Sequence, residues 1–192
     1  MNRSCSRKYS FRFVVILTAV ALLLAPQGGW SQLNSSPANV VLTATLLESL
    51  TVVALPSAVD FNLAPGGEAI GSSPVTITTT WILGVTRTVV NLHASFSSST
   101  VALTDGSTHN IPSANVFGQV TTGTAPSFTA FTQTAPFGAA GAGLKLISQP
   151  LTVINLTSSR TDTLNLKIDL TSGPNLPAGV YVSTLNIQAQ AL

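Results

Sequence analysis

The sequence predicts an all-β protein, a single antiparallel β-sandwich. Apolar and polar residues alternate strictly over two segments near the end of the chain, 163–170 and 185–190, and this two-residue period is the signature of half-buried strands. About ten short segments of this kind are separated by turns rich in proline and glycine, and none has a convincing helical period. Many short strands with frequent turn signals are typical of a sandwich.

The first strand is predicted at 40–46, where alternation begins. Three leucines at positions 46, 47 and 50 are also compatible with a helix, but the density of β-branched residues favours a strand. A second short strand at 50–55 ends at Pro56. Alternating apolar residues at 59–63 then lead into a Pro-Gly-Gly turn at 65–67.

Two longer strands are predicted at 75–81 and 86–96, on either side of Gly84. In the second of them, we expect Val90, Leu92, Ala94 and Phe96 to face the core, and Arg87, Asn91, His93 and Ser95 to face solvent. The Asp105-Gly106 dipeptide is typical of a compact turn, and it predicts a hairpin between 101–104 and the segment that ends at Ile111.

The alternation fails over 118–143, a segment rich in Gly, Ala, Ser and Thr that is expected to be a long loop. A loop of this length is uncommon inside a compact domain, so it is expected either to be functional or mobile, or to contain one irregular edge strand. Strand patterns return at 144–148 and 151–155. The chain is then expected to close with a hairpin of 163–170 and 176–192.

Residues 1–31 are predicted to be a secretory signal peptide. Four basic residues precede an apolar run of thirteen residues, 13–25, which is shorter than the ~20 residues that a membrane-spanning helix needs. Small residues at Gly29 and Ser31 suit the signal peptidase, so cleavage is predicted after Ser31. The mature chain, 32–192, is then one exported domain, periplasmic, cell-surface or extracellular, with no stable membrane insertion.

Removal of the leader changes the charge of the chain. The whole sequence has eight Lys and Arg and six Asp and Glu; four of the bases and none of the acids lie in 1–31, so residues 32–192 carry a net charge of −2. No basic patch remains, which argues against nucleic acid as a partner. The single cysteine, Cys5, also lies in the leader. Stability is therefore expected to come from core burial rather than from disulfides.

The sequence assigns no catalytic, cofactor-binding or metal-binding residues. His93 and His109 have no carboxylates at metal-ligand spacing, and HExxH, EF-hand and G-x-S-x-G motifs are missing from the sequence. Asp105-Gly106 is interpreted as a turn rather than a calcium loop. Trp81 is interpreted as a core or rim residue rather than a sugar-stacking platform. A protein that is not an enzyme and uses no cofactor is therefore expected.

Two phenylalanines within the long loop, Phe128 and Phe131, allow two interpretations. They could form an exposed contact patch for a partner. The alternative is that they anchor the loop on the core, and this second interpretation is favoured because large exposed apolar patches are rare on monomers.

The residues from Leu176 to Tyr181 read Leu-Pro-Ala-Gly-Val-Tyr, which looks like the tyrosine corner of immunoglobulin-like sandwiches. There the phenol binds backbone upstream and fixes the crossover between sheets. The corner strand is normally followed by one more strand, whereas here the sequence ends. A partner's strand could fill the gap, and the candidate strand donor, within the chain or in a neighbour, consists of Val40, Leu42, Ala44 and Leu46.

The leader, the 40–46 segment, Val-Asp-Phe-Asn-Leu-Ala-Pro-Gly at 59–66 and the 177–190 segment together resemble bacterial spore-coat-U-type and related pilin-like domains. The resemblance implies an exported sandwich associated with chaperone-usher assembly, with no catalytic residues. The first hypothesis is therefore a structural subunit that assembles with itself or with other surface subunits. The second is a stand-alone secreted module that binds glycan or protein in adhesion, and the third an exported hydrolase.

Overall fold

A computed structural model describes residues 33–192, so the predicted signal peptide at 1–31 lies outside the described residues. The chain divides into two compact units, 1–44 and 45–192, and the first is described only from residue 33. Residues 33–48 form no strand or helix and are exposed. The strand predicted at 40–46 is therefore wrong, because an extended segment becomes a strand only when another strand's backbone pairs with it.

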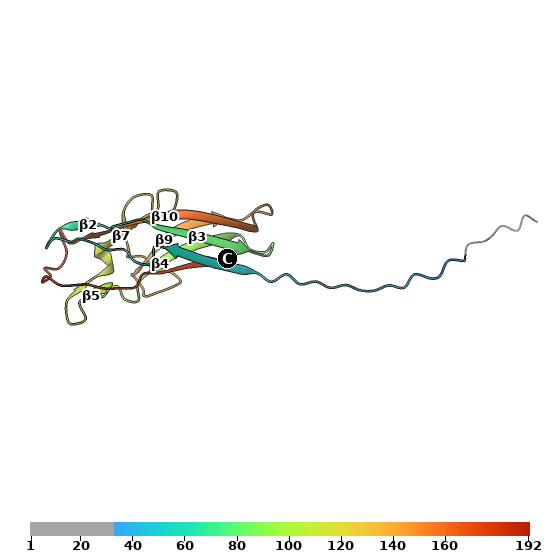
Figure 1. The fold of residues 1–192 in the computed structure, drawn as a ribbon, viewed down its shortest axis with the longest axis horizontal. Coiled ribbons are helices and arrows are strands. Elements are labelled where there is room, and N and C mark those ends of the chain that lie inside the picture. The colour runs from blue at the N-terminus through green and yellow to red at the C-terminus, as the bar shows by residue number, and fades with distance from the viewer. Residues whose placement is uncertain (1–32) are drawn as a thin grey trace, which may run out of the picture. The chain divides into compact units, whose positions relative to one another are not determined.

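The larger sheet of the second unit has six strands (Figure 1). They are β1 (Ser49–Leu55), β2 (Glu68–Ile70), β3 (Val75–Ile82), β7 (Val116–Gln119), β8 (Thr129–Ala130) and β10 (Thr157–Asp169). Their order is β1-β3-β10-β7-β8, with β2 on the C-terminal part of β10, and every pair is antiparallel. The strands predicted at 50–55 and 75–81 are confirmed. Residues 59–63 form no strand, although Val59, Phe61 and Leu63 pack against the core.

The smaller sheet has three strands, in the order β11-β4-β9. They are β4 (Val89–Ser95), β9 (Gly143–Pro150) and β11 (Asn186–Ala191), again antiparallel. A separate short hairpin joins β5 (Leu103–Thr104) to β6 (Asn110–Ile111), where the Asp-Gly turn predicts one. The one helical element of the described residues is a 3₁₀ turn, η1 (Ser113–Asn115).

The core lies between the two sheets, and the all-β sandwich fold is confirmed. Alternation places Ile77 of β3 and Leu164 of β10 on the inner face of the larger sheet, and both are fully buried. Leu92 of β4 and Leu144 of β9 cover them from the smaller sheet. Deep burial of branched side chains from both sheets is the main stabilising contribution, about 1.5–3 kcal/mol for each one.

The predicted closing hairpin is wrong, because its two halves lie in different sheets. β10 pairs with β3, β7 and β2, whereas β11 pairs only with β4. Residues 170–185 therefore cross from one sheet to the other. The two alternating segments share a strand pattern, but a pattern shows which side chains face inward and not which sheet a strand joins.

The prediction that Asn91, His93 and Ser95 face solvent is also wrong, since all three are buried. The loop that follows β8 covers the outer face of β4. Phe137 stacks edge-on against His93, with ring centroids 6.1 Å apart. Gly138 has a φ of 77°, and a Cβ there would lie 2.6 Å from Cβ of Ser95, so only glycine allows the loop to approach this closely.

The segment predicted as one long loop, 118–143, contains the end of β7 and all of β8, in line with the irregular edge strand left open by the sequence. The strand predicted at 151–155 is wrong. There the amide of Thr152 donates to Oδ1 of Asn155 at 2.7 Å, and the amide of Asn155 donates to the carbonyl of Thr152. These bonds close a turn between β9 and β10.

Candidate functional site

One side of the sandwich is not closed by backbone hydrogen bonds. β1 forms the edge of the larger sheet and β11 the edge of the smaller sheet, and the two edge strands lie side by side. Within residues 33–192, β1 pairs only with β3 and β11 only with β4. The outer backbone groups of both strands are therefore free to pair with an added strand, as edge strands generally are. We call this region the open side.

The apolar side chains of the open side are only partly covered. Val52 and Ala54 of β1 are half-buried and pack against the core. Leu185, just before β11, and Ile187 and Ala189 within it, do the same from the other sheet. A strand that added to either edge would remove the rest of this apolar surface from water, at about 25 cal/mol per Å².

A charged clamp fixes the point at which the chain enters β1. Nη2 of Arg87 donates to Oε2 of Glu48 at 2.8 Å, and the amide of Gly84 donates to Oε1 at 2.6 Å. The hydrogen bond from Arg87 lowers the pKa of Glu48 to about 2. Nη1 of Arg87 also donates to the carbonyl of Ala191 at 3.4 Å. Residue 48 is thereby held beside the end of β11, at one end of the open side.

The candidate strand donor lies directly before this clamp. Val40 is 79% exposed, Leu42 89% and Leu46 82%, and Ala44 is exposed as well. Alternate residues of an extended chain point to the same side. These four apolar side chains can therefore form one face of a strand when a backbone edge is supplied.

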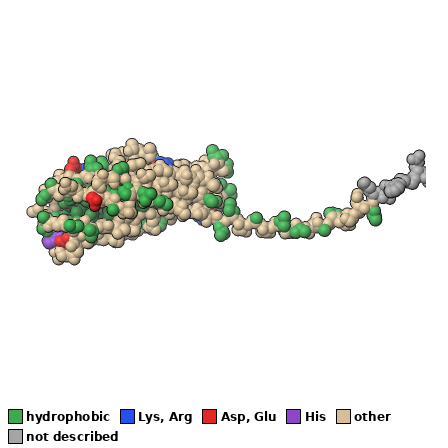
Figure 2. Space-filling view, in the orientation of Figure 1, with side chains coloured by type: hydrophobic (Ala, Val, Ile, Leu, Met, Phe, Trp, Pro, Cys, Tyr) green, Lys and Arg blue, Asp and Glu red, His purple; other side chains and the backbone are tan. Residues whose placement is uncertain are grey.

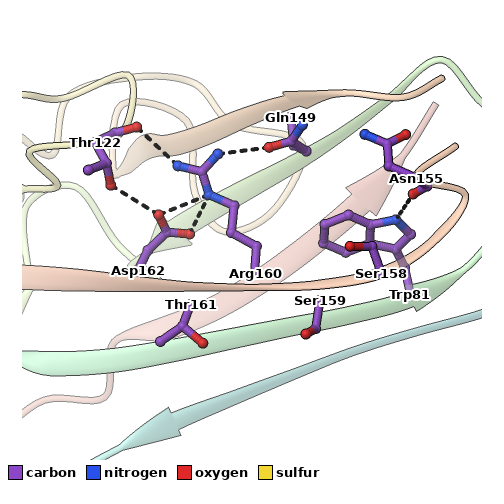
Figure 3. A pocket seen from close by; sticks show the side chains of 9 residues that line it. All are labelled: Trp81, Thr122, Gln149, Asn155, Ser158, Ser159, Arg160, Thr161 and Asp162. Atoms are coloured by element: carbon purple, nitrogen blue, oxygen red, sulfur yellow. Dashed lines mark hydrogen bonds and ion pairs between the residues drawn. The ribbon is translucent and has the colours of Figure 1, made fainter.

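A polar cleft of about 380 Å³ lies between the two sheets, and Figure 3 shows its lining. Nε of Arg160, on β10, donates to both carboxylate oxygens of Asp162 at 3.0 and 2.9 Å. Nη1 donates to Oε1 of Gln149 on β9 at 2.8 Å, and Nη2 donates to the carbonyl of Thr122 at 3.0 Å. This arginine joins the two sheets and the turn after β7.

Trp81 forms the floor of the same cleft. Its Nε1 donates to the carbonyl of Asn155 at 2.8 Å, but only 2% of the residue is exposed, in agreement with a core or rim position. The charges of Arg160 and Asp162 compensate one another, so the cleft has no net charge with which to attract an ion. Its chemistry suits a neutral ligand rich in hydroxyl groups.

The structure shows what the remaining predicted site residues contact, namely Tyr181 and the two phenylalanines of the predicted contact patch. The Tyr181 hydroxyl donates to the carbonyl of Pro177 at 3.0 Å, the backbone bond expected of a tyrosine corner. Phe131 is fully buried and packs edge-on against Phe96, 5.2 Å away, so it offers no surface to a partner. Phe128 is half-buried, and Nζ of Lys167 lies 5.8 Å from its ring centroid.

The clamp and the cleft were not found by reasoning from motifs. The sequence does contain a signal for the cleft. Leu164 and Leu166 of β10 face the core, and because alternate residues of a strand face the same side, Asp162 and Arg160 are expected to face inward as well. Charged residues at inward positions indicate a buried pair or a site. The clamp has no comparable signal, since Glu48 and Arg87 are far apart in the sequence.

No cluster of three or more His, Cys, Asp and Glu side chains that could hold a metal ion occurs in the part of the chain that the structure describes. In residues 33–192, no helix has both the length and the apolar character to cross a membrane. Comparisons with protein-family models, with curated protein sequences and with solved structures find no match to this chain.

Proposed function

We propose that this protein is an exported, non-enzymatic structural subunit of a surface or extracellular assembly, pilin-like or coat-like in its construction. The observation that carries the proposal is the combination, in one chain, of an exposed segment with a strand pattern at 40–46 and an open side with two unpaired strand edges. Each supplies what the other lacks. The exposed segment needs a backbone edge, and the open side needs a strand to cover its apolar residues.

Strand addition between copies is the arrangement that these features favour. Main-chain hydrogen bonds to β1 or β11 would give affinity, and Val40, Leu42, Ala44 and Leu46 would cover the half-buried side chains of the open side. A return onto the same body would require the chain to reverse between Leu46 and Ser49. Glu48, which lies in that stretch, is already bonded to Gly84 and Arg87.

The test uses a chain from which residues 33–47 are deleted. Without the donor, its open side stays uncovered, and we expect the protein to aggregate. A synthetic peptide of residues 40–47 should restore a soluble β-rich species, measured by size-exclusion chromatography with light scattering and by far-ultraviolet circular dichroism. A matched peptide with serine at 40, 42, 44 and 46 should not. A deleted chain that remains folded and monomeric and ignores the peptide would rule out strand addition.

The polar cleft favours a second candidate function, binding of a glycan by the isolated domain. Three of the five N–H groups of Arg160 are used by partners within residues 33–192, which leaves two for a ligand. Trp81 is the one tryptophan of the mature chain, so its fluorescence reports on the cleft alone. Titration with glucose, galactose, mannose and N-acetylglucosamine should change this fluorescence, and Arg160→Gln should abolish the change while Arg87→Gln should not.

A further inference from the structure

Large apolar side chains gather at one end of the sandwich, which we call the proximal pole because β1 begins there. Val85 is 80% exposed, Val153 82% and Ile154 90%. Leu47, next to the clamp, and the terminal Leu192 are exposed at the same end. Figure 2 shows hydrophobic side chains over this end of the body.

Hydrogen bonds show that these residues belong to one surface. The amide of Leu83 donates to the carbonyl of Leu156 at 2.9 Å, and the amide of Leu151 donates to the carbonyl of Thr88 at 2.8 Å. The turn that carries Val85 and the turn that carries Val153 and Ile154 therefore lie side by side. The amide of Thr88 donates to the carbonyl of Leu192, which brings the last residue to the same place.

The folding of these turns does not explain their apolar residues. Asn155 sets the conformation of the β9–β10 turn through its bonds to Thr152 and to the carbonyl of Pro150. Val153 and Ile154, which lie between Thr152 and Asn155, take no part in those hydrogen bonds. Turn positions usually carry polar residues or glycine, and clustered exposed apolar side chains mark an interaction surface.

We propose that the proximal pole packs against the opposite, distal pole of a second copy of this chain. The distal pole carries exposed apolar residues of its own in the crossover between the sheets, Val180 at 80% and Val182 at 61%. The inference rests on the proposed strand addition and identifies a second contact between the same two copies.

Chain length forces the two bodies together. Leu46 is the last residue of the donor and Glu48 is already clamped to the body, so the stretch from residue 46 to residue 48 spans at most about 7 Å. A copy whose donor strand lies on a neighbour therefore holds its own proximal pole directly against that neighbour. Contact between two apolar poles removes apolar surface from water and is therefore favourable, whereas charged poles would repel one another or remain solvated.

For a donor that pairs with β11 of its neighbour, the direction of β11 identifies which pole of the neighbour is met. β11 runs toward the proximal pole, because Ala191 contacts Arg87 of the clamp. A donor strand antiparallel to β11 leaves its neighbour at the distal pole, so each pole is used once and the chain of copies can continue. A parallel donor would bring two proximal poles together and would use one surface twice.

A second copy fits this surface better than a lipid membrane does. Helices and loops that bind anionic membranes surround their apolar residues with Lys and Arg. At the proximal pole, the basic residue is Arg87, and its charge is paired with Glu48 at 2.8 Å. The pole is thus apolar and locally neutral.

Thiol cross-linking tests the contact directly, because the mature chain has no natural cysteine. The full mature chain with Ile154→Cys and Val180→Cys should give a ladder of covalent oligomers with a short bismaleimide. The control with Ile154→Cys and Thr161→Cys should not, because Thr161 lies within β10, where it pairs with Thr78 of β3, and not in either pole. If the chain with Ile154→Cys and Val180→Cys gives no ladder while the chain without residues 33–47 still becomes soluble with the 40–47 peptide, the pole contact is overturned but strand addition is not.

Serine substitutions give the second measurement. Val153→Ser with Ile154→Ser should leave peptide affinity of the deleted chain unchanged but speed dissociation of the full-length oligomer at least about tenfold, since two large apolar side chains lose their burial. Ile70→Ser, which removes an exposed apolar side chain from β2, away from the two edge strands of the open side, is the matched control. Equal dissociation rates for the unsubstituted chain, the double variant and the control variant would contradict the proposal. A ladder without any peptide response would support the pole contact and reject strand addition.

Discussion

A single hydroxyl group restrains the connection between the two sheets. Tyr181 lies in the crossover between β10 and β11, and its bond to the carbonyl of Pro177 closes the turn at 177–179. Burial, and then the negative charge of Asp105, raise the pKa of this phenol. The hydroxyl therefore remains a donor throughout the neutral range.

Replacement of Tyr181 with phenylalanine should lower the melting temperature by a small but measurable amount. The ring keeps its packing, and only the bond to Pro177 is lost, in a position where water can replace part of it. The measurement is thermal unfolding followed by circular dichroism. A larger loss in Tyr181→Leu would separate packing from the bond, and an unchanged melting temperature in Tyr181→Phe would show that the bond contributes nothing.

His93 should make the fold sensitive to mild acid. It is buried, its Nδ1 has no partner within residues 33–192, and burial, followed by the charge of Lys145 on β9, lowers its pKa. The unfolded state, with a pKa near 6.5, then binds a proton more readily than the folded state does. Stability is therefore complete above about pH 6.5, falls as the pH drops below that value, and levels off below the folded pKa.

Chemical denaturation between pH 7.5 and pH 5 measures this effect. His109→Gln should be present in every sample, so that His93 is the one remaining histidine of residues 33–192. His93→Gln in that background should flatten the pH dependence. The carboxyl groups of Glu48, Asp105 and Asp169, with pKa values of about 2, lose their contributions only at lower pH. Identical pH profiles with and without His93 would contradict the prediction.

At the level of elements, the alternation of apolar and polar residues predicts where most strands lie but not which strands pair with one another. β3 and β9 follow patterns that are visible in the sequence, whereas the pairing of β11 with β4 depends on a crossover that leaves no local signal. The outer face of β4 was misjudged because the loop that covers it, around Phe137, has no periodicity. The 40–46 segment has a strand pattern, but no strand pairs with it within residues 33–192, so its sequence pattern alone does not decide its conformation.

The loop after β8 should depend on one of its phenylalanines far more than on the other. Phe131→Ala removes a fully buried ring from contact with Phe96 and should cost about 3–5 kcal/mol of unfolding free energy. Phe128→Ala removes a half-buried ring beside Lys167 and should cost less than about 1 kcal/mol. Urea unfolding gives both values. Similar losses for the two variants would mean that the loop is anchored elsewhere.

At the level of the whole molecule, low charge and an unclosed sandwich favour association. The described residues contain four basic side chains, and Arg87, Arg160 and Lys167 are each paired with acids. Little charge therefore remains to hold copies apart. Residues 45–192 carry the unpaired strand edges and the apolar proximal pole, and the exposed 40–46 segment precedes them in the sequence, so in the proposed assembly each copy would offer both a donor and an acceptor.

Thermal stability of the mature chain should consequently rise with its own concentration. A strand that binds only the folded acceptor adds RT ln(1 + [L]/Kd), about 2.7 kcal/mol when the free donor concentration is 100 times Kd. Melting temperatures measured over a hundredfold range of protein concentration should increase steadily. A chain with serine at Val40, Leu42, Ala44 and Leu46 keeps every residue of the sandwich but offers no apolar face, so it should aggregate like the deleted chain and show no melting temperature that rises with concentration. A mature chain whose melting temperature ignores concentration would have to close its sandwich alone, and the glycan-binding function would then be the better explanation of the molecule.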